Sequence, residues 1–265
     1  GGTNPNARGW TAANMATYGP IARTMRDLRA AFHTMLRPNW ADPFWTPAQE
    51  SFTQIHTSNR VALVTDDSLG VDPIVRDTIR YAGQLLENAG YEVTEQSPPR
   101  MEECFDLWMS LSSPDLLLGL VPMLPLIDDA GLTTVFENWR SDFPPPTSEN
   151  FLKAHMLRDL LIREWNQFFA QYPLVVLPAY STSFMRRSQD TESPTSMTEI
   201  AKDARYMLNI PALAFPTMSF PVGSHGGAPL GIQIAAHSWR EDLILNAGEA
   251  IENQLGKITP VDPAW

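Results

Sequence analysis

Residues 209–237 constrain the fold more than any other stretch, because they hold two apolar runs joined by the glycine-rich turn SHGGAP. Runs such as 213–222 and 230–236 are typical of strands that are buried on both faces of a sheet. Proline has no N–H to donate to a ladder, so Pro216 and Pro221 either split the first run or confine it to a sheet edge. The stretch therefore predicts two short strands with a bend or the boundary of a site beside them.

Two polar side chains, Ser219 and Gln233, interrupt these apolar runs. Buried polar groups need hydrogen-bond partners, which are usually backbone groups or water. A bound ligand can also supply such a partner. The sequence leaves both interpretations open, a pair of satisfied core residues or two groups that face a pocket.

The composition favours a globular α/β protein. The chain has 265 residues, of which 43% are apolar and 18% are charged, and this balance is ordinary for a folded domain. A formal net charge of −11 argues against a nucleic-acid surface, which needs a basic patch to displace counterions. The length suits one large domain or part of a larger one.

Cys104 is the single cysteine, so it cannot form an internal disulfide and it fits a reducing, cytoplasmic compartment. Its neighbours Glu102, Glu103 and Asp106 would raise the pKa of the thiol, which gives no support to a catalytic thiol. The opening residues GGTNPNARGW lack the basic and apolar regions of a signal peptide.

An apolar segment at residues 116–127 is interrupted by Pro122 and Pro125. It is shorter than the roughly 20 residues that span a bilayer. We expect this segment to cap a pocket, and we expect no membrane contact. Prolines and helical runs alternate throughout residues 97–160, and long irregular segments of this kind are commonly functional caps.

Periodicity predicts most of the remaining elements. Thr24 is the N-cap of an amphipathic helix that ends before Pro38. A strand, a helix with Gly90 after it and a second strand form a βαβ unit within residues 60–95. Further helices are predicted at 149–171 with Ser148 as the N-cap, at 197–208 and at 239–255.

A buried strand at residues 172–178 precedes a polar loop at 179–197. Open α/β sheets bind ligands outside the carboxyl ends of their strands. This loop therefore contains candidates for a binding pocket, among them Tyr180 and Phe184.

Several segments together resemble the amidase signature family of hydrolases. SFPVG and PLGIQ resemble its S-x-P-x-G and P-x-G-x-Q pair, and GPIARTMRDL resembles the segment that follows its nucleophile region. The βαβ unit and the strand YPLVVLP also have counterparts in the family. The chain departs from the pattern at Tyr172, where the family often has aspartate, and at Arg37, where RPNWADPFW lacks a glycine. The resemblance covers most of residues 17–255 and is weak at 97–148.

The resemblance implies an α/β fold, the C-terminal portion of the amidase signature fold, with a mixed β-sheet flanked by helices. Residues 1–265 would form the C-terminal part of one amidase domain. Its parts would be a loop at 1–16, a helix and βαβ unit at 17–96, a helical cap or substrate region at 97–160, and a sheet with a closing helix at 161–265.

The family uses a Ser-Ser-Lys triad, in which a neutral lysine removes the serine proton and backbone N–H groups stabilise the oxyanion. The family's triad segments precede GPIAR, so the resemblance places all three residues outside this chain. Lys153, Lys202 and Lys257 lie in polar contexts where solvated lysine is the default. Neither the histidine spacing nor the single cysteine predicts a metal site, and no cofactor is expected.

The family resemblance implies part of an amidase that cleaves the C–N bond of a carboxylic amide, or an ester, through an acyl-serine intermediate. The expected partners are a small amide substrate, an N-terminal part that carries the triad, and a second copy in a homo-oligomer. Two alternatives stay open, a non-catalytic scaffold protein and an A-type component of an amidotransferase. The residues that we expect to bind substrate are Met218, Ser219, Gln233, Tyr180, Phe184 and Trp108.

Overall fold

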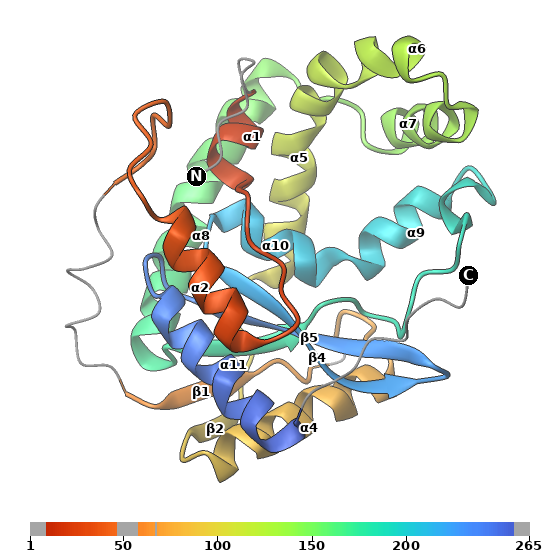
Figure 1. Cartoon of the computed structure of the whole chain (residues 1–265). Coiled ribbons are helices and arrows are strands. Elements are labelled where there is room, and N and C mark those ends of the chain that lie inside the picture. The colour runs from red at the N-terminus through yellow and green to blue at the C-terminus, as the bar shows by residue number, and fades with distance from the viewer. Residues whose placement is uncertain (1–8, 47–57, 67, 257–265) are drawn as a thin grey trace.

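The computed structural model describes residues 9–46, 58–66 and 68–256. A five-stranded mixed sheet lies at its centre, in the order β2-β1-β3-β5-β4 (Figure 1). Strand β1 is parallel to β2 and β3, whereas β5 is antiparallel to β3 and β4. The predicted mixed sheet flanked by helices is confirmed. The strands are β1 (Arg60–Leu63), β2 (Glu92–Glu95), β3 (Leu174–Pro178), β4 (Thr217–His225) and β5 (Ala228–Ala236).

Helices cover both faces of this sheet. Helices α2, α4, α8 and α11 begin and end close to their predicted limits. They are α1 (Trp10–Met15), α2 (Met25–Met35), α4 (Pro73–Asn88), α5 (Met101–Gly119), η1 (Val121–Met123), α6 (Leu124–Ile127), α7 (Ala130–Asp142), α8 (Ser148–Gln171), η2 (Gln189–Thr191), α9 (Ser196–Asp203), α10 (Arg205–Leu213) and α11 (Glu241–Leu255).

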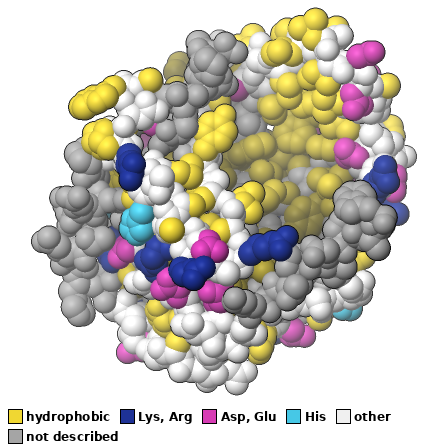
Figure 2. All heavy atoms as spheres, in the orientation of Figure 1, with side chains coloured by type: hydrophobic (Ala, Val, Ile, Leu, Met, Phe, Trp, Pro, Cys, Tyr) yellow, Lys and Arg dark blue, Asp and Glu magenta, His cyan; other side chains and the backbone are white. Residues whose placement is uncertain are grey.

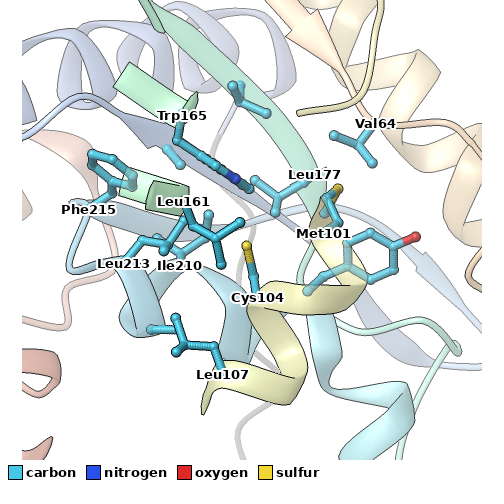
Figure 3. Close-up of a cluster of buried hydrophobic side chains, with 14 of the residues drawn as sticks. Val64, Met101, Cys104, Leu107, Leu161, Trp165, Leu177, Ile210, Leu213 and Phe215 are labelled. Carbon is cyan, nitrogen blue, oxygen red and sulfur yellow. The ribbon is translucent and has the colours of Figure 1, made fainter. Parts of the chain in front are cut away.

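Strand alternation divides the core into two layers. Because successive side chains of a strand point to opposite faces, Val61 and Leu63 of β1 pack with α2, α4 and α11, whereas Ala62 and Val64 pack with α5, α8 and α10. Figure 3 shows part of the second layer, where Trp165 of α8 and Cys104 of α5 meet. Both layers are apolar at their centres. Packing of these side chains against the helices holds the strands, and therefore their ends, in position.

The predicted βαβ unit is present. Strand β1 pairs with β2 in parallel register from Arg60↔Glu92 to Leu63↔Glu95, and α4 connects them. Gly90 follows α4 with a φ of 92°, a left-handed conformation that glycine adopts without steric cost. Because β1 is parallel to β2 and β3, the carboxyl ends of all three strands lie at the same end of the sheet.

Helix limits and caps differ from the sequence prediction at three places. The residues predicted as an opening loop include helix α1, while residues 1–8 lie outside the described part. Thr24 caps α2 as predicted, accepting from the N–H of Asp27 at 3.1 Å. The N-cap of α8 is Thr147 rather than Ser148, and its hydroxyl accepts from the N–H of Asn150 at 3.2 Å. The predicted helix at 197–208 is two helices, α9 and α10.

The first apolar run of residues 209–237 is partly helical. Helix α10 extends to Leu213, and Ala214 reverses the chain in a left-handed conformation with a φ of 58°. Strand β4 then forms an edge of the sheet, as its prolines predict, with an irregular register between Pro221 and Gly223. The expectation of burial on both faces is wrong for β4, because Thr217, Ser219 and Pro221 are exposed.

The apolar helical segment within 97–160 is longer than predicted. By length and composition, one helical segment in the described ranges could cross a membrane, Met101–Ile127, with a mean hydropathy of 1.4. A helix buried in a protein core passes the same test. Cys104, Leu107 and Leu111 of α5 are indeed buried in the core, whereas Leu118 and Leu126 are each 80% exposed.

Candidate functional site

A hollow lined by hydrophobic side chains opens between the helices α5, α6 and α7 and the helices α9 and α10 (Figures 1 and 2). A separate apolar cluster joins these elements, and aromatic rings dominate it. Trp139 lies 6.1 Å from Trp108, edge to face, and 4.9 Å from Phe143 between ring centroids. Phe105, Met109, Trp139 and Ala201 are its buried members, and Trp108, Leu116, Phe143, Met197 and Leu208 are partly exposed. Figure 2 shows that the surface of this hollow is apolar, the kind of surface that binds an acyl group.

A smaller cavity lies at the carboxyl end of β3, where the sequence predicts pocket residues. Its volume is about 170 Å³. Tyr180 lines it and donates a hydrogen bond from its hydroxyl to the carbonyl of Ile200 at 3.3 Å. Burial, with a contribution from Asp203, raises the pKa of Tyr180 to about 12, so the phenol is neutral at physiological pH. The other lining residues are Val75, Thr78, Ala179, Thr182, Ser183, Pro229, Leu230 and Gly231.

Ser219 and Gln233 lie directly opposite each other on β4 and β5. Gln233 is 1% exposed, and its Nε2 donates to the carbonyl of Pro178 at 2.9 Å. The sequence left open whether Gln233 bonds a backbone group in the core or faces a pocket, and the structure shows the backbone bond. Because Pro178 is the last residue of β3, Gln233 holds the start of the loop that carries Tyr180. Ser219 is exposed on the edge strand.

The structure does not bring the six predicted substrate-binding residues into one pocket. Met218 packs in the opposite layer, against Met25 of α2 and Gly248 of α11, because neighbouring residues of a strand face opposite sides. Phe184 is 50% exposed on the loop beyond Tyr180. Trp108 is partly exposed and belongs to the aromatic cluster around Trp139. Met218 therefore cannot share a surface with Ser219, and we do not retain it as a candidate.

The described residues offer binding surfaces rather than reactive groups. Cys104 is completely buried, and burial raises the pKa of its thiol to about 12, so the thiolate is not available. Lys153 is exposed and pairs with Glu149 at 2.6 Å, and Lys202 is exposed on α9. Lys257 lies outside the described residues. Within 9–46, 58–66 and 68–256, no group of three His, Cys, Asp or Glu side chains could hold a metal ion.

Two buried polar residues near these surfaces were not singled out from the sequence. Ser181 is 1% exposed, and its Oγ has no hydrogen-bond partner among the described residues. Its backbone joins two segments, because its N–H donates to Asp203 at 2.8 Å and its carbonyl accepts from Asp72 at 2.9 Å. Asn209 donates from Nδ2 to the carbonyl of Met101 at 2.8 Å and so ties α10 to the start of α5. For Asn209, the only signal in the sequence was its position at the start of an apolar run.

Comparison with known proteins gives one consistent answer. The sequence model of the family described as Amidase matches residues 4–245. Over 244 residues the chain is 29% identical to an indoleacetamide hydrolase of Bradyrhizobium japonicum, covering 91% of this chain and 52% of that protein. It is 25% identical to the A-type component of a glutamyl-tRNA(Gln) amidotransferase of Brevibacillus brevis, covering 71% of this chain and 42% of that protein.

Solved structures show the same fold. A fatty acid amide hydrolase superposes with a TM-score of 0.69 at 19% identity, over 93% of this chain and 50% of that one. A 6-aminohexanoate cyclic dimer hydrolase with bound substrate superposes with a TM-score of 0.68 at 18% identity, over 89% and 54%. The chain spans about half the length of the first curated relatives it matches.

Proposed function

The chain belongs to the amidase family, and we propose that it forms part of an enzyme that hydrolyses the C–N bond of a carboxylic amide. In the proposed reaction a serine oxygen attacks the amide carbonyl carbon, the C–N bond breaks and the nitrogen leaves with a proton as ammonia or an amine. Water then hydrolyses the acyl-serine ester and releases the acid. This chain would supply the sheet edge and the acyl-binding surface.

The aromatic hollow is the observation that carries this proposal. An acyl group that enters it would lie beside elements that carry the partly exposed rings Trp108 and Phe143, which pack with the buried Trp139, and ring-to-ring packing would favour an aromatic substituent. An indoleacetamide hydrolase is among the relatives, which supports the same preference. We therefore propose an amide of an aryl-substituted acid as the substrate class.

We place the Ser-Ser-Lys triad outside residues 1–265. The two lysines that the structure describes are exposed on helices, and a lysine base has to be desolvated to be neutral at physiological pH. An N-terminal part that carries the triad would pack against the chain and close the hollow.

Labelling with a fluorophosphonate tests this division of roles. A protein that contains the triad together with this chain should be labelled irreversibly and should hydrolyse phenylacetamide faster than acetamide. The 265-residue chain alone should take up no label. Labelling of that chain would overturn the placement of the triad, and equal rates for the two amides would overturn the aromatic preference.

An A-type component of an amidotransferase is the second candidate, because several relatives carry that name. The two indoleacetamide hydrolases match at 29% and 28% identity over 91% of this chain, whereas the amidotransferase component of Lactiplantibacillus plantarum matches at 25% identity over 94%. The free-standing amidase is therefore the better-supported proposal. Amide hydrolysis that appears only after a companion protein is added would favour the amidotransferase, and no hydrolysis under either condition would favour a scaffold role.

A further inference from the structure

A second cavity lies at the carboxyl ends of the parallel strands β1 and β2. Its volume is about 340 Å³, within the range of small-molecule sites. The start of α5 and one residue of α10, Tyr206, close it. The lining residues are Val64, Asp66, Ser68, Leu69, Ser97, Pro98, Arg100, Met101, Glu102, Glu103 and Tyr206. Ligands of open α/β sheets bind at strand ends of this kind.

Tyr206 is the feature of this cavity that ordinary packing does not explain. The residue is 1% exposed; its hydroxyl oxygen is not fully sealed from the cavity that Tyr206 lines, and among the described residues it has no hydrogen-bond partner. A buried tyrosine hydroxyl normally has one. Burial, together with the charge of Asp66, raises the pKa of Tyr206 to about 12, although Arg205 opposes the shift. The phenol is therefore neutral at physiological pH, and its oxygen can accept a hydrogen bond from a ligand.

The charge around the cavity is negative. Among the described lining residues Arg100 is the only cation, and its guanidinium is already paired with Glu103 and, at 3.3 Å, with Glu164. Asp66 accepts the N–H of Ser68 through Oδ1 at 2.8 Å and forms no ion pair with another described residue, and Glu102 is exposed at the start of α5. The unneutralised carboxylates at the mouth of the cavity are thus Asp66 and Glu102.

The N-terminus of α5 favours an anion, in contrast to the carboxylates, because the first N–H groups of a helix carry a partial positive charge. Within the described part of the chain, no side chain caps these N–H groups in α5. Glu102 and Glu103 stand in this first turn, however, and their charges offset the positive end of the helix. Arg205, beside Tyr206, adds a positive charge from outside the lining. The described lining itself carries Asp66, Glu102 and Glu103 against the single cation Arg100, and it therefore favours a cation over an anion.

The inner wall is apolar. Figure 3 shows Val64, from the end of β1, and Met101, from the start of α5, on the same side of the buried cluster. Leu69 and Pro98 also line the cavity. A short aliphatic chain would bury its surface against these residues, whereas a bare metal ion would gain nothing from them.

We propose that this cavity is a binding site for a small primary ammonium with a short aliphatic chain. The carboxylates of Asp66 and Glu102 and the hydroxyl oxygen of Tyr206 accept from the ammonium, and Val64, Leu69, Pro98 and Met101 contact the chain. None of the lining residues belongs to the aromatic cluster around Trp139, and the proposal stands whether or not the chain takes part in amide hydrolysis.

Binding of n-butylammonium chloride to the purified protein, measured by isothermal titration calorimetry and by thermal shift, tests the proposal. Two further compounds are measured at matched ionic strength. Sodium butyrate replaces the positive charge by a negative one, and 1-butanol keeps the aliphatic chain without a charge. Saturable binding of n-butylammonium alone is expected. Saturable binding of butyrate instead would make the start of α5 an anion site and overturn the proposal, as would the absence of binding by all three compounds.

Two variants assign the contacts. Asp66→Asn keeps an acceptor for the N–H of Ser68 but removes the charge, and Tyr206→Phe removes only the hydroxyl. Each should weaken n-butylammonium binding by about tenfold, because a hydrogen bond to a charged group contributes about that factor or more. Glu137→Gln, which removes an exposed carboxylate on α7, should leave binding unchanged. Unchanged affinity in both Asp66→Asn and Tyr206→Phe would overturn the site.

Discussion

Asp115 of α5 caps helix α1 from a distant part of the sequence, because its Oδ2 accepts the backbone N–H of Thr11 at 2.7 Å. The same oxygen accepts the N–H of Ala12 at 3.1 Å. A helix of six residues is too short to be stable by itself. Gly9 permits the contact, because a Cβ at that position would overlap the Asp115 carboxylate. Docking of α1 therefore depends on a residue from the helix that borders the hollow.

Asp115→Ala should lower the free energy of unfolding by about 1 kcal/mol, the usual cost of losing an N-cap. Asp115→Asn keeps an acceptor oxygen and should cost less. Urea denaturation of the two variants beside the parent protein measures the difference. Equal stability of Asp115→Ala and the parent would show that α1 docks without this cap.

Gly83 and Gly119 form a matched pair of helical glycines. A Cβ at Gly83 of α4 would overlap the side chain of Leu63 in the closed core, whereas a Cβ at Gly119 of α5 would meet nothing within 4 Å among the described residues. Gly83→Ala should destabilise the protein by about 1–3 kcal/mol through overpacking, despite the better helix propensity of alanine. Gly119→Ala should stabilise it by up to about 1 kcal/mol.

Thermal or urea unfolding of both variants provides the measurement. Opposite signs of the two effects are the expected result. A stabilising Gly83→Ala would mean that Leu63 can move aside, and that the packing of α4 on β1 is looser than the structure shows.

Gln233 should be needed for stability as well as for the position of the loop after β3. Gln233→Leu leaves the carbonyl of Pro178 without its 2.9 Å donor, and an unsatisfied buried acceptor costs about 1–3 kcal/mol. Gln96→Leu is the control, because the Gln96 amide donates to the carbonyl of Ser97 at the surface, at 3.2 Å. Chemical denaturation should show a large loss for the first variant and little change for the second.

Glu95 should contribute to the loss of folding stability at acidic pH. Hydrogen bonds from Arg80 and Thr65 lower the pKa of Glu95 below its ordinary value of 4.5. A lowered pKa in the folded state means that the stabilisation is fully present above pH 4.5 and is lost as the pH falls through the folded pKa.

Glu95→Gln should therefore reduce stability at about pH 6 and flatten its decline at more acidic pH. Urea midpoints measured across this range would reveal the change of slope. Because the pair is half exposed, with 48% and 52% of the two side chains accessible, added salt should diminish the effect. An identical slope in the variant and the parent would contradict the assignment.

The candidate site could be predicted only in part. Tyr180 lines a cavity at a strand end because the carboxyl ends of strands in open α/β sheets are a general location for ligands. Gln233 proved to be satisfied by a backbone group, the alternative that the sequence left open. Trp108 packs against Trp139, which in turn packs against Phe143, and all three rings come from a region where the sequence has little periodicity. Met218 was predicted on the wrong side, because neighbouring residues of a strand face opposite layers.

Local patterns by themselves determined several elements of this protein. The apolar periodicity of residues 73–88, the proline-bearing edge strand and the glycine turn at 226–227 follow from short-range sterics and side-chain spacing, which a sequence displays directly. Only the tertiary structure decided that Asp115 caps α1 and that Asp66 and Tyr206 line one cavity. These relationships join residues from distant parts of the chain. They depend on how two apolar layers pack against one sheet, and no local pattern encodes which distant side chains such packing brings together.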